Sequence, residues 1–156
     1  MKIRTGKSED VDVCILLGTA MHEESRYRHL SYDSEHCRRY ADRLMNSENK
    51  LFLVAEEDGD VVGFLTGRVE RHLFGPELLG QEELLYIRPE RRNGMAGYKL
   101  MKEWMIWCRE KGCVETTFAT TAIQRDQFGA LANRLGMHHA GNVYKWRTNY
   151  DTRRVA

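Results

Sequence analysis

Residues 91–97 (RRNGMAG) have the composition of an anion-binding loop, between a predicted strand ending near Ile87 and a long predicted helix. The first N–H groups of a helix have no acceptor within the helix, and the helix dipole makes them attractive to anions. Gly94, Ala96 and Gly97 keep side-chain volume small where a phosphate must approach the backbone. The segment therefore predicts a phosphate or pyrophosphate site, with an ordinary loop before a helix as the alternative.

The common nucleotide-binding loops do not account for this segment. The chain contains no GxxxxGK[ST] motif, and a GxGxxG motif would require glycine where Met95 or Ala96 stands. Positive charge is nevertheless present, because Arg91, Arg92 and Lys99 lie close to the glycines. The segment therefore indicates a phosphate site of another kind.

Two adjacent carboxylates, Glu82 and Glu83, begin the strand that leads to this loop. Alternate residues of a strand face opposite sides, so we expect Glu83 to share a face with Leu85 and Ile87, and Glu82 to point the other way. A carboxylate close to the anion site could act as a general base. The alternative is that both are solvated charges at the start of a strand.

The spacing of apolar residues predicts the elements that position these groups. Helical spacing predicts one helix of about three turns after Ser8 and a second from about Ser34, separated by the polar residues 22–32. Two apolar runs around Asp58-Gly59 predict a β-hairpin. The other expected elements are strands at 2–5, 83–87 and 114–119, a helix ending at Gly112, a helix at 125–135, and a closing hairpin of 137–140 and 143–147. This order indicates a mixed sheet with helices on both faces.

The composition fits one domain, which we expect to span residues 1–156. Apolar residues make up 42% of the chain, which is too many for a disordered protein. The net charge of +1 argues against a nucleic-acid partner, and no apolar run is long enough for a membrane span. Scattered cysteines and an N-terminus without signal-peptide character predict a cytoplasmic protein. We expect no metal site, because His138 and His139 would face opposite sides of a strand.

A motif around the anion-binding loop resembles the signature of a known family. The pattern L-x-I-x-P at residues 85–89, followed by R-x-x-G-x-A at residues 91–96, resembles the signature of the GNAT superfamily of acyl-CoA-dependent N-acyltransferases. Residues 54–64 (VAEEDGDVVGF) and 131–137 (LANRLGM) resemble a hairpin and the end of the last helix in that superfamily. Residues 21–25 and 97–104 are most similar to members carried by phages and prophages. The resemblance covers nearly the whole chain, as a single N-acetyltransferase domain.

The resemblance implies a fold and a cosubstrate. It implies an α/β (mixed α+β) fold with a mixed, mostly antiparallel sheet of about seven strands and about four helices on both faces. The fourth and fifth strands would splay apart, and acetyl-CoA would enter the gap with its pantetheine hydrogen-bonded to the backbone of Ile87. The resemblance places the pyrophosphate on the amides of Arg92, Asn93, Gly94, Met95, Ala96 and Gly97, with Tyr98 and Lys99 flanking it.

The resemblance also implies a reaction, the transfer of an acetyl group to a primary amine in a ternary complex. We favour Glu83 over Glu82 as the base. Ala132 stands where many members carry the tyrosine that protonates the leaving thiolate, so we nominate Tyr144 as the acid, with Tyr98 and Tyr86 as alternatives. A non-catalytic acyl-CoA-binding module on the same fold is the second interpretation.

The acceptor side is expected at the segment between the first two helices, where His22, Glu23 and Glu24 could hold a cationic amine. An exposed acidic loop is the alternative. The acceptor would be a small-molecule or peptide amine, and the resemblance makes a homodimer possible.

Overall fold

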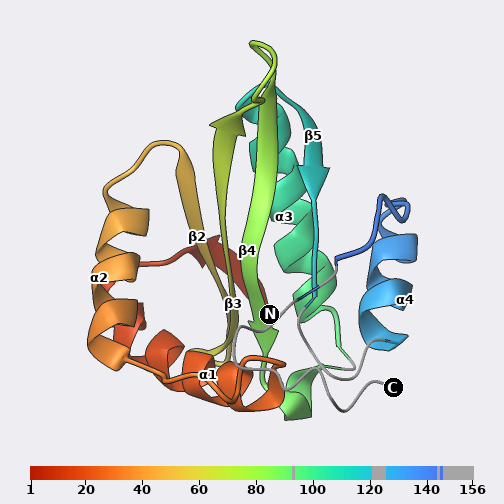
Figure 1. The fold of residues 1–156 in the computed structure, drawn as a ribbon. Coiled ribbons are helices and arrows are strands. Elements are labelled where there is room, and N and C mark those ends of the chain that lie inside the picture. Colours follow the sequence, from red (N-terminus) through yellow and green to blue (C-terminus); the bar gives the residue numbers. More distant parts are fainter. Residues whose placement is uncertain (93, 121–125, 144, 146–156) are drawn as a thin grey trace, which may run out of the picture.

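The computed structural model describes residues 1–92, 94–120, 126–143 and 145 (Figure 1). These residues form five strands: β1 (Lys2–Thr5), β2 (Lys50–Glu57), β3 (Asp60–Arg71), β4 (Leu78–Ile87) and β5 (Cys113–Thr117). They form four α-helices: α1 (Val11–Glu24), α2 (Ser34–Met45), α3 (Ala96–Glu110) and α4 (Asp126–Arg134). Short 3-10 helices at Ser8–Asp10 and Pro89–Arg91 precede α1 and follow β4.

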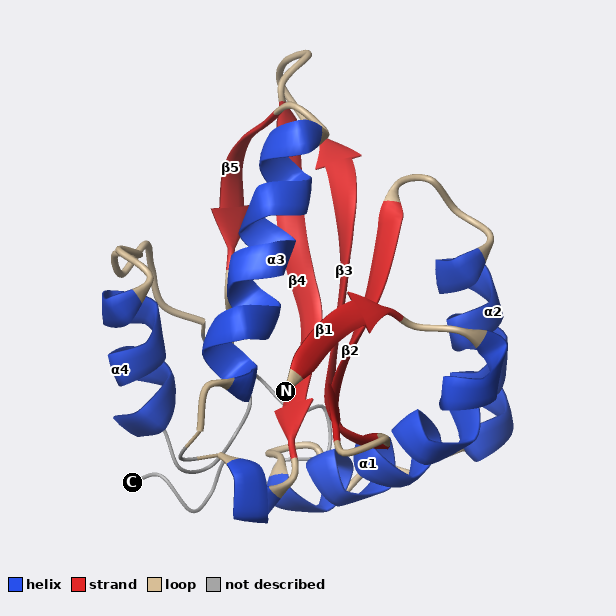
Figure 2. Ribbon diagram, turned by 180° about the vertical axis from the view of Figure 1, so that it is seen from behind, coloured by secondary structure: helices blue, strands red, loops and turns tan. Residues whose placement is uncertain are grey.

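The strands form one mixed sheet in the order β1-β2-β3-β4-β5. The first three pairs are antiparallel, and β5 runs parallel to β4. Helix α3 covers one face, and α1 and α2 border the opposite face (Figures 1 and 2). The mixed, mostly antiparallel sheet with helices on both faces is therefore confirmed.

The expected closing hairpin accounts for the difference from seven strands. Residues 137–143 contain no strand, and most of its second arm, Tyr144 and residues 146–147, lies outside the described residues. Within the described chain, no helix combines the length and apolar character needed to cross a bilayer.

Each face of the sheet has its own apolar core. On the α3 face, Trp104, Leu100 and Met101 are fully buried against residues of β2, β3 and β4. On the other face, a smaller cluster joins Leu17 of α1 and Leu44 of α2 to apolar side chains of the same three strands. Strand β4 contributes to both cores, so its alternate side chains enter two different environments.

Strands β4 and β5 separate part-way along β4. Their register pairs Leu78 with Cys113 and Gln81 with Thr117, and it ends there. From Glu82 to Ile87, β3 is the only strand among the described residues that pairs with β4. Figure 1 shows the two strands diverging toward the end of β4. The splay predicted from the family resemblance is therefore present.

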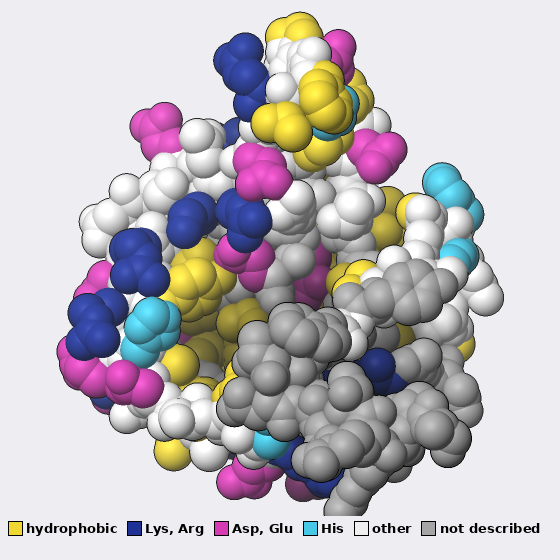
Figure 3. Space-filling view, viewed as in Figure 1, with side chains coloured by type: hydrophobic (Ala, Val, Ile, Leu, Met, Phe, Trp, Pro, Cys, Tyr) yellow, Lys and Arg dark blue, Asp and Glu magenta, His cyan; other side chains and the backbone are white. Residues whose placement is uncertain are grey.

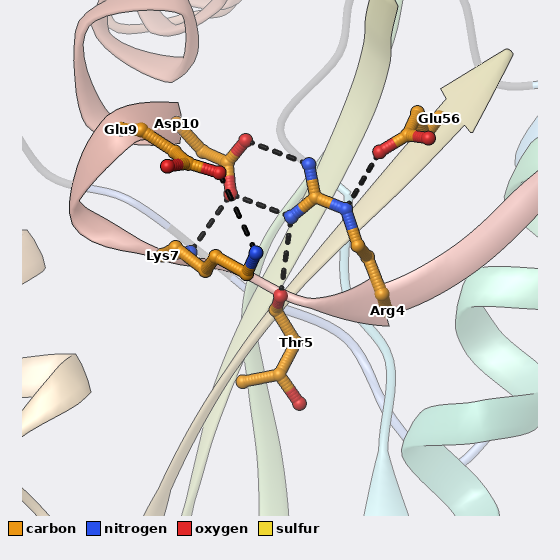
Figure 4. Close-up of polar contacts among 6 residues, drawn as sticks. All are labelled: Arg4, Thr5, Lys7, Glu9, Asp10 and Glu56. Atoms are coloured by element: carbon orange, nitrogen blue, oxygen red, sulfur yellow. Dashed lines mark hydrogen bonds and ion pairs between the residues drawn. The ribbon is translucent and has the colours of Figure 1, made fainter. Parts of the chain in front are cut away.

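The start of α1 is fixed by a network of charged residues on β1 and β2 (Figure 4). Arg4 donates from Nη1 and Nη2 to the Asp10 carboxylate at 2.7 and 2.9 Å, and from Nε to Glu56 at 2.7 Å. Asp10 also accepts the backbone N–H of Lys7 at 2.8 Å. The guanidinium of Arg4 lowers the pKa of the buried Asp10 carboxyl. This network ties the first strand to the start of the helix that contains His22, Glu23 and Glu24.

Helix α1 is longer than the sequence indicated. We expected His22, Glu23 and Glu24 in a loop, but they form the last turn of α1. The expectation was wrong because these polar residues border a cavity, where the turn needs no apolar side chain facing the core. Ser25 ends the helix by donating its N–H to the carbonyl of His22 at 3.1 Å.

Candidate active site

A cavity of about 940 Å³ opens where β4 and β5 separate. Its walls come from α1, α2, β4, the start of α3 and α4. Figure 3 shows this face of the molecule hollowed, with hydrophobic side chains lining the recess. The cavity brings together Glu82, Glu83 and Ile87, all expected in the site. It also includes the other expected residues His22, Glu23, Glu24, Arg92, Gly94, Gly97 and Tyr98.

A β-bulge in β4 decides which way the two carboxylates point. Glu82 lies opposite Gly67 and Leu84 lies opposite Thr66, so Glu83 is an extra residue in the ladder. A bulge interrupts the alternation of side chains between the two faces. A Cβ on Gly67 would lie 2.6 Å from the Trp104 ring, so Gly67 faces α3. Glu82 lies opposite Gly67 in the register and therefore lies on the same, α3 side. The expected sharing of a face by Glu83, Leu85 and Ile87 is wrong for this reason.

Glu82 lies at the opening between β4 and β5. Its carboxylate accepts the backbone N–H of Ala119, just beyond β5, at 3.4 Å. The pKa of Glu82 is raised to about 8. Desolvation is the largest cause, the bond from Ala119 partly offsets it, and the negative charge of Glu83 raises the pKa further. A carboxylate with a pKa near neutrality can both accept and return a proton at physiological pH.

Glu83 is held by side chains on the opposite face. Its two oxygens accept hydrogen bonds from the Tyr40 hydroxyl of α2 and from Arg68 Nη1 of β3. Arg68 also donates to Gln81 at 2.7 Å, and Tyr40 lies 3.1 Å from the Thr66 hydroxyl. Burial and the bond to Glu83 raise the pKa of Tyr40. Glu83 is therefore a fixed, ion-paired carboxylate.

The backbone of β4 presents polar groups to the opening. Arg88 donates its N–H to Val62 of β3 at 2.9 Å, so the alternation of an antiparallel ladder turns the Ile87 peptide groups away from β3. The Ile87 carbonyl accepts a bond from Arg92 Nε at 2.9 Å. The strand thus offers backbone groups along the side of the cavity, as expected for Ile87.

The start of α3 presents free N–H groups where an anion site was expected. The first bond within the helix runs from Lys99 N–H to the Met95 carbonyl at 2.9 Å, so the N–H groups of Ala96, Gly97 and Tyr98 have no acceptor within the helix. A Cβ on Gly94 would meet only the Arg91 carbonyl, at 3.4 Å.

The side chains expected at this loop differ in their positions. Ala96 is fully buried beneath the loop, and the Lys99 ammonium lies 3.5 Å from the Met1 carbonyl. Met95 is absent from the cavity walls that the structure describes, although its Sδ lies 3.4 Å from Arg134 Nη2. Asn93 lies outside the described residues. The loop's contribution to the cavity is therefore its backbone and its small residues.

The residues of α1 that were expected on the acceptor side have different partners. Glu24 forms an ion pair with Arg92 at 2.7 Å and accepts the Tyr86 hydroxyl at 2.8 Å. Glu23 is exposed at the rim. His22 has a buried Nε2 without a hydrogen-bond partner in the described structure, and its ring lies 5.5 Å from the Tyr32 ring.

Comparison with protein families matches residues 18–137 to the acetyltransferase (GNAT) family. The chain belongs to this family. No curated protein sequence matches it.

Solved structures with the same fold include other GNAT proteins. Glucosamine-6-phosphate N-acetyltransferase from Arabidopsis thaliana superposes with a TM-score of 0.74 at 17% identity, covering 95% of this chain and 98% of that one. An aminoglycoside antibiotic 6'-N-acetyltransferase from Acinetobacter haemolyticus gives 0.74 at 18%, covering 97% and 100%. A transcriptional regulator from Bacillus halodurans gives 0.78 at 17%, covering 94% and 98%. These similarities show the GNAT fold.

GNAT acetyltransferases use acetyl-CoA, and the site offers the groups that this molecule needs. The opening beside β4 has backbone groups for an amide-containing chain, and α3 begins with N–H donors beside two glycines. The ring of Tyr98 lies 4.6 Å under the guanidinium of Arg134, which adds a cation at this end of the cavity.

This GNAT chain departs from the common pattern at the tyrosine of the last helix. Ala132 is in α4, as the resemblance implied, and supplies no phenol there. Tyr144, nominated as the acid, lies outside the described residues. Of the two alternatives, Tyr86 is bound to Glu24, and its pKa is raised to about 12, first by desolvation and then by this bond.

Three residues of the site were missed from the sequence: Tyr40, Arg68 and Arg134. The sequence placed Tyr40 only in the apolar stripe of the second expected helix and gave no indication of a role for Arg68. Nothing in their local sequence indicates that they meet Glu83, because 43 residues separate Tyr40 from Glu83. The sequence showed Arg134 only as a basic residue on the expected last helix.

Proposed function

We propose that this protein transfers the acetyl group of acetyl-CoA to a primary amine by direct attack in a ternary complex, with Glu82 as the general base. The observation that carries this proposal is the position of Glu82. It lies in the opening between β4 and β5, in the same cavity as Gly94 and Gly97 at the start of α3.

Acetyl-CoA supplies an activated acetyl thioester. The amine nitrogen forms a bond to the acetyl carbon as the carbon–sulfur bond breaks, and the thiolate leaves with the electron pair of that bond. A primary amine is mostly protonated at neutral pH, so its ammonium proton must be removed before attack. Glu82 takes this proton. The nitrogen loses its second proton after the bond to the acetyl carbon has formed, and this proton passes through solvent to the departing thiolate.

The contacts of the two carboxylates support Glu82 over Glu83 for this role. Glu83 already accepts bonds from Arg68 and Tyr40, and a positive partner makes a carboxylate a weaker base. Glu82 accepts one long bond, from Ala119, and has a raised pKa. Glu83 instead has a positioning role. It is the extra residue of the bulge, and its bonds to Tyr40 and Arg68 hold the bulge that turns Glu82 toward the opening.

The chain's own donors would hold the acyl donor. The N–H groups at the start of α3 would bind the pyrophosphate, and the outward peptide groups of Leu85 and Ile87 would bind the pantetheine. Backbone donors in fixed positions also suit the oxyanion that develops on the thioester oxygen.

Calorimetric titration of acetyl-CoA tests the cosubstrate. We expect micromolar binding to the unmodified protein and loss of binding in Gly94→Glu, because the added carboxylate would occupy the pyrophosphate position. The backbone at Gly94 has room for a side chain, so the fold should tolerate this variant. Gly141→Glu is the matched control, since Gly141 is absent from the described cavity walls and nothing lies within 4 Å of its Cβ position.

The release of free CoA thiol in the presence of amines tests catalysis. A non-catalytic acyl-CoA-binding module is favoured by one observation, Ala132 in place of the usual tyrosine. Such a module would bind acetyl-CoA and lose binding in Gly94→Glu, yet release no thiol with any amine. Absence of acetyl-CoA binding would contradict both functions.

A further inference from the structure

The acceptor side of the cavity is lined mainly by apolar and aromatic side chains. Tyr27, Tyr32 and Tyr40 come from the α1–α2 part of the chain, and Phe64 and Leu84 come from the sheet. Phe64 also belongs to the apolar core on this face. A ligand placed against this wall gains from burying apolar surface.

Two carboxylates on this side are neutralised by arginines. Glu24 is paired with Arg92, and Glu83 is paired with Arg68, which also forms an ion pair with Glu70 at 3.1 Å. Each also accepts a hydrogen bond from a tyrosine, Tyr86 and Tyr40 respectively. If a ligand carried another positive charge besides its reacting amine, that charge would have to compete with an arginine for either carboxylate.

The other charges on this side cancel or are weak. At the rim, Glu23 and Arg28 are both exposed and of opposite sign. Glu82, with its pKa raised to about 8, is largely protonated and uncharged at neutral pH, and only its ionised fraction acts as the base. Among the described residues that line this side, Glu24 and Glu83 are thus held by arginines, and Glu23 is exposed to solvent at the rim.

The polar atoms here are also nearly all satisfied. The hydroxyls of Tyr32, Tyr40 and Tyr86 bond to Ile15 O, Glu83 and Glu24. The exception on the described walls is His22 Nε2, which is buried without a partner. A neutral imidazole nitrogen can donate or accept one hydrogen bond, so the site can recognise one polar group on a largely apolar ligand.

We propose that the acceptor is a singly charged primary amine attached to an aromatic or apolar body, and that pairing of the wall carboxylates with arginines disfavours polycationic and sugar-phosphate amines. This inference rests on the proposed function and names its substrate class. Desolvating additional charges or hydroxyls against this wall would cost free energy without matching partners. The amine itself would be directed to Glu82, and the aromatic rings around it suit an ammonium group.

The direct test measures binding to the protein saturated with CoA, which has no acetyl group to transfer. Calorimetric titrations would use 2-phenylethylamine, spermidine, kanamycin and glucosamine 6-phosphate. We expect 2-phenylethylamine to bind at least tenfold more tightly than the other three and to give the highest kcat/KM with acetyl-CoA. Tighter binding of kanamycin, spermidine or glucosamine 6-phosphate would overturn the proposal, as would a lack of binding by 2-phenylethylamine.

A variant that removes the arginine partner of Glu83 tests whether pairing of the wall carboxylates with arginines disfavours polycationic amines. Arg68→Gln leaves Glu83 without its cation, so binding of spermidine relative to 2-phenylethylamine should rise about tenfold. Arg71→Gln, an exposed substitution near the end of the same strand, should leave the ratio unchanged. An unchanged ratio in a folded Arg68→Gln protein would refute the role given to the ion pair.

The failures of the two proposals are distinguishable. If acetyl-CoA does not bind, the proposed function fails. If acetyl-CoA binds and another amine class is acetylated in preference, only the acceptor class fails.

Discussion

The two faces of the sheet contain different kinds of interior. On the α3 face, Trp104, Leu100 and Met101 are fully buried, and the Trp104 indole donates to the Thr116 hydroxyl at 2.8 Å. On the α1–α2 face, a smaller apolar cluster lies beside the half-buried network of Tyr40, Glu83 and their partners. Apolar packing stabilises the first face, whereas the second keeps paired charges beside a cavity.

Strand β4 connects these two environments. Its apolar side chains alternate between the two cores, and its bulge puts Glu83 on the same face as Leu84, which leaves Glu82 on the α3 side. One strand can therefore contribute both to a stable core and to a reactive site. In β4 this depends on the bulge at Glu83, which interrupts the alternation of side chains between the two faces. Variants on the two faces should therefore change different measured quantities.

The largest effect on stability is expected from Trp104→Ala on the α3 face. Removal of this fully buried indole should lower the free energy of unfolding by about 3–5 kcal/mol, because it leaves a large cavity. Urea denaturation measures this loss. The half-buried neighbour Trp107 is the matched control, and an equal loss in Trp107→Ala would contradict the ranking of the two sites.

Glu82→Gln should affect catalysis instead. The amide cannot accept the ammonium proton, so kcat should fall by about 10²–10⁴-fold. Steady-state thiol release measures kcat, and calorimetry should show unchanged affinity for acetyl-CoA. Glu83→Gln is the paired control and should lower kcat less. If Glu83→Gln proves the more damaging of the two, the roles of the carboxylates are reversed.

The pH dependence follows from the raised pKa of Glu82, about 8 against an ordinary value of 4.5. At saturating amine, kcat should rise about tenfold per pH unit below 8 and level off above it, because only the ionised carboxylate is a base. The same shift has the opposite sign for stability. Ionisation is harder in the folded state, so the contribution of Glu82 to stability should decrease as the pH rises from about 4.5 to 8. A kcat profile that is flat between pH 6 and 8 would contradict this assignment.

The smallest effect is expected outside the two cores, at the network that starts α1. Asp10→Asn weakens the bonds from Arg4 and should cost about 1–3 kcal/mol at neutral pH. Since Arg4 lowers the pKa of Asp10, its contribution to stability is present above the ordinary value of 3.8 and is lost as the pH falls below it. Thermal unfolding at pH 7 and pH 3 measures the difference. Asp12→Asn, at an exposed ion pair, should change stability little at either pH.

The fold could be predicted in large part because its signals are local. The Asp58-Gly59 turn forms the β2–β3 hairpin with Asp58 and Gly59 at positive φ, and Gly112 follows α3 with a φ of 80°. Apolar spacing located the beginning of α2, where Asp33 caps the N–H groups of Glu35 and His36. The end of α1 was missed because helix propensity does not show that a polar last turn will border a cavity.

The sequence by itself determined the family, the order of the main elements and the glycine-bearing loop before α3, because each depends on residues close together in the chain. Only the tertiary structure decided the directions of Glu82 and Glu83. Their orientation depends on a mismatch in register between two strands, which no alternation rule contains. The pairing of Glu83 with Arg68 and Tyr40, and of Glu24 with Arg92, was likewise decided by folding. Electrostatic neutralisation depends on distances in space, and these exist only once the chain has folded.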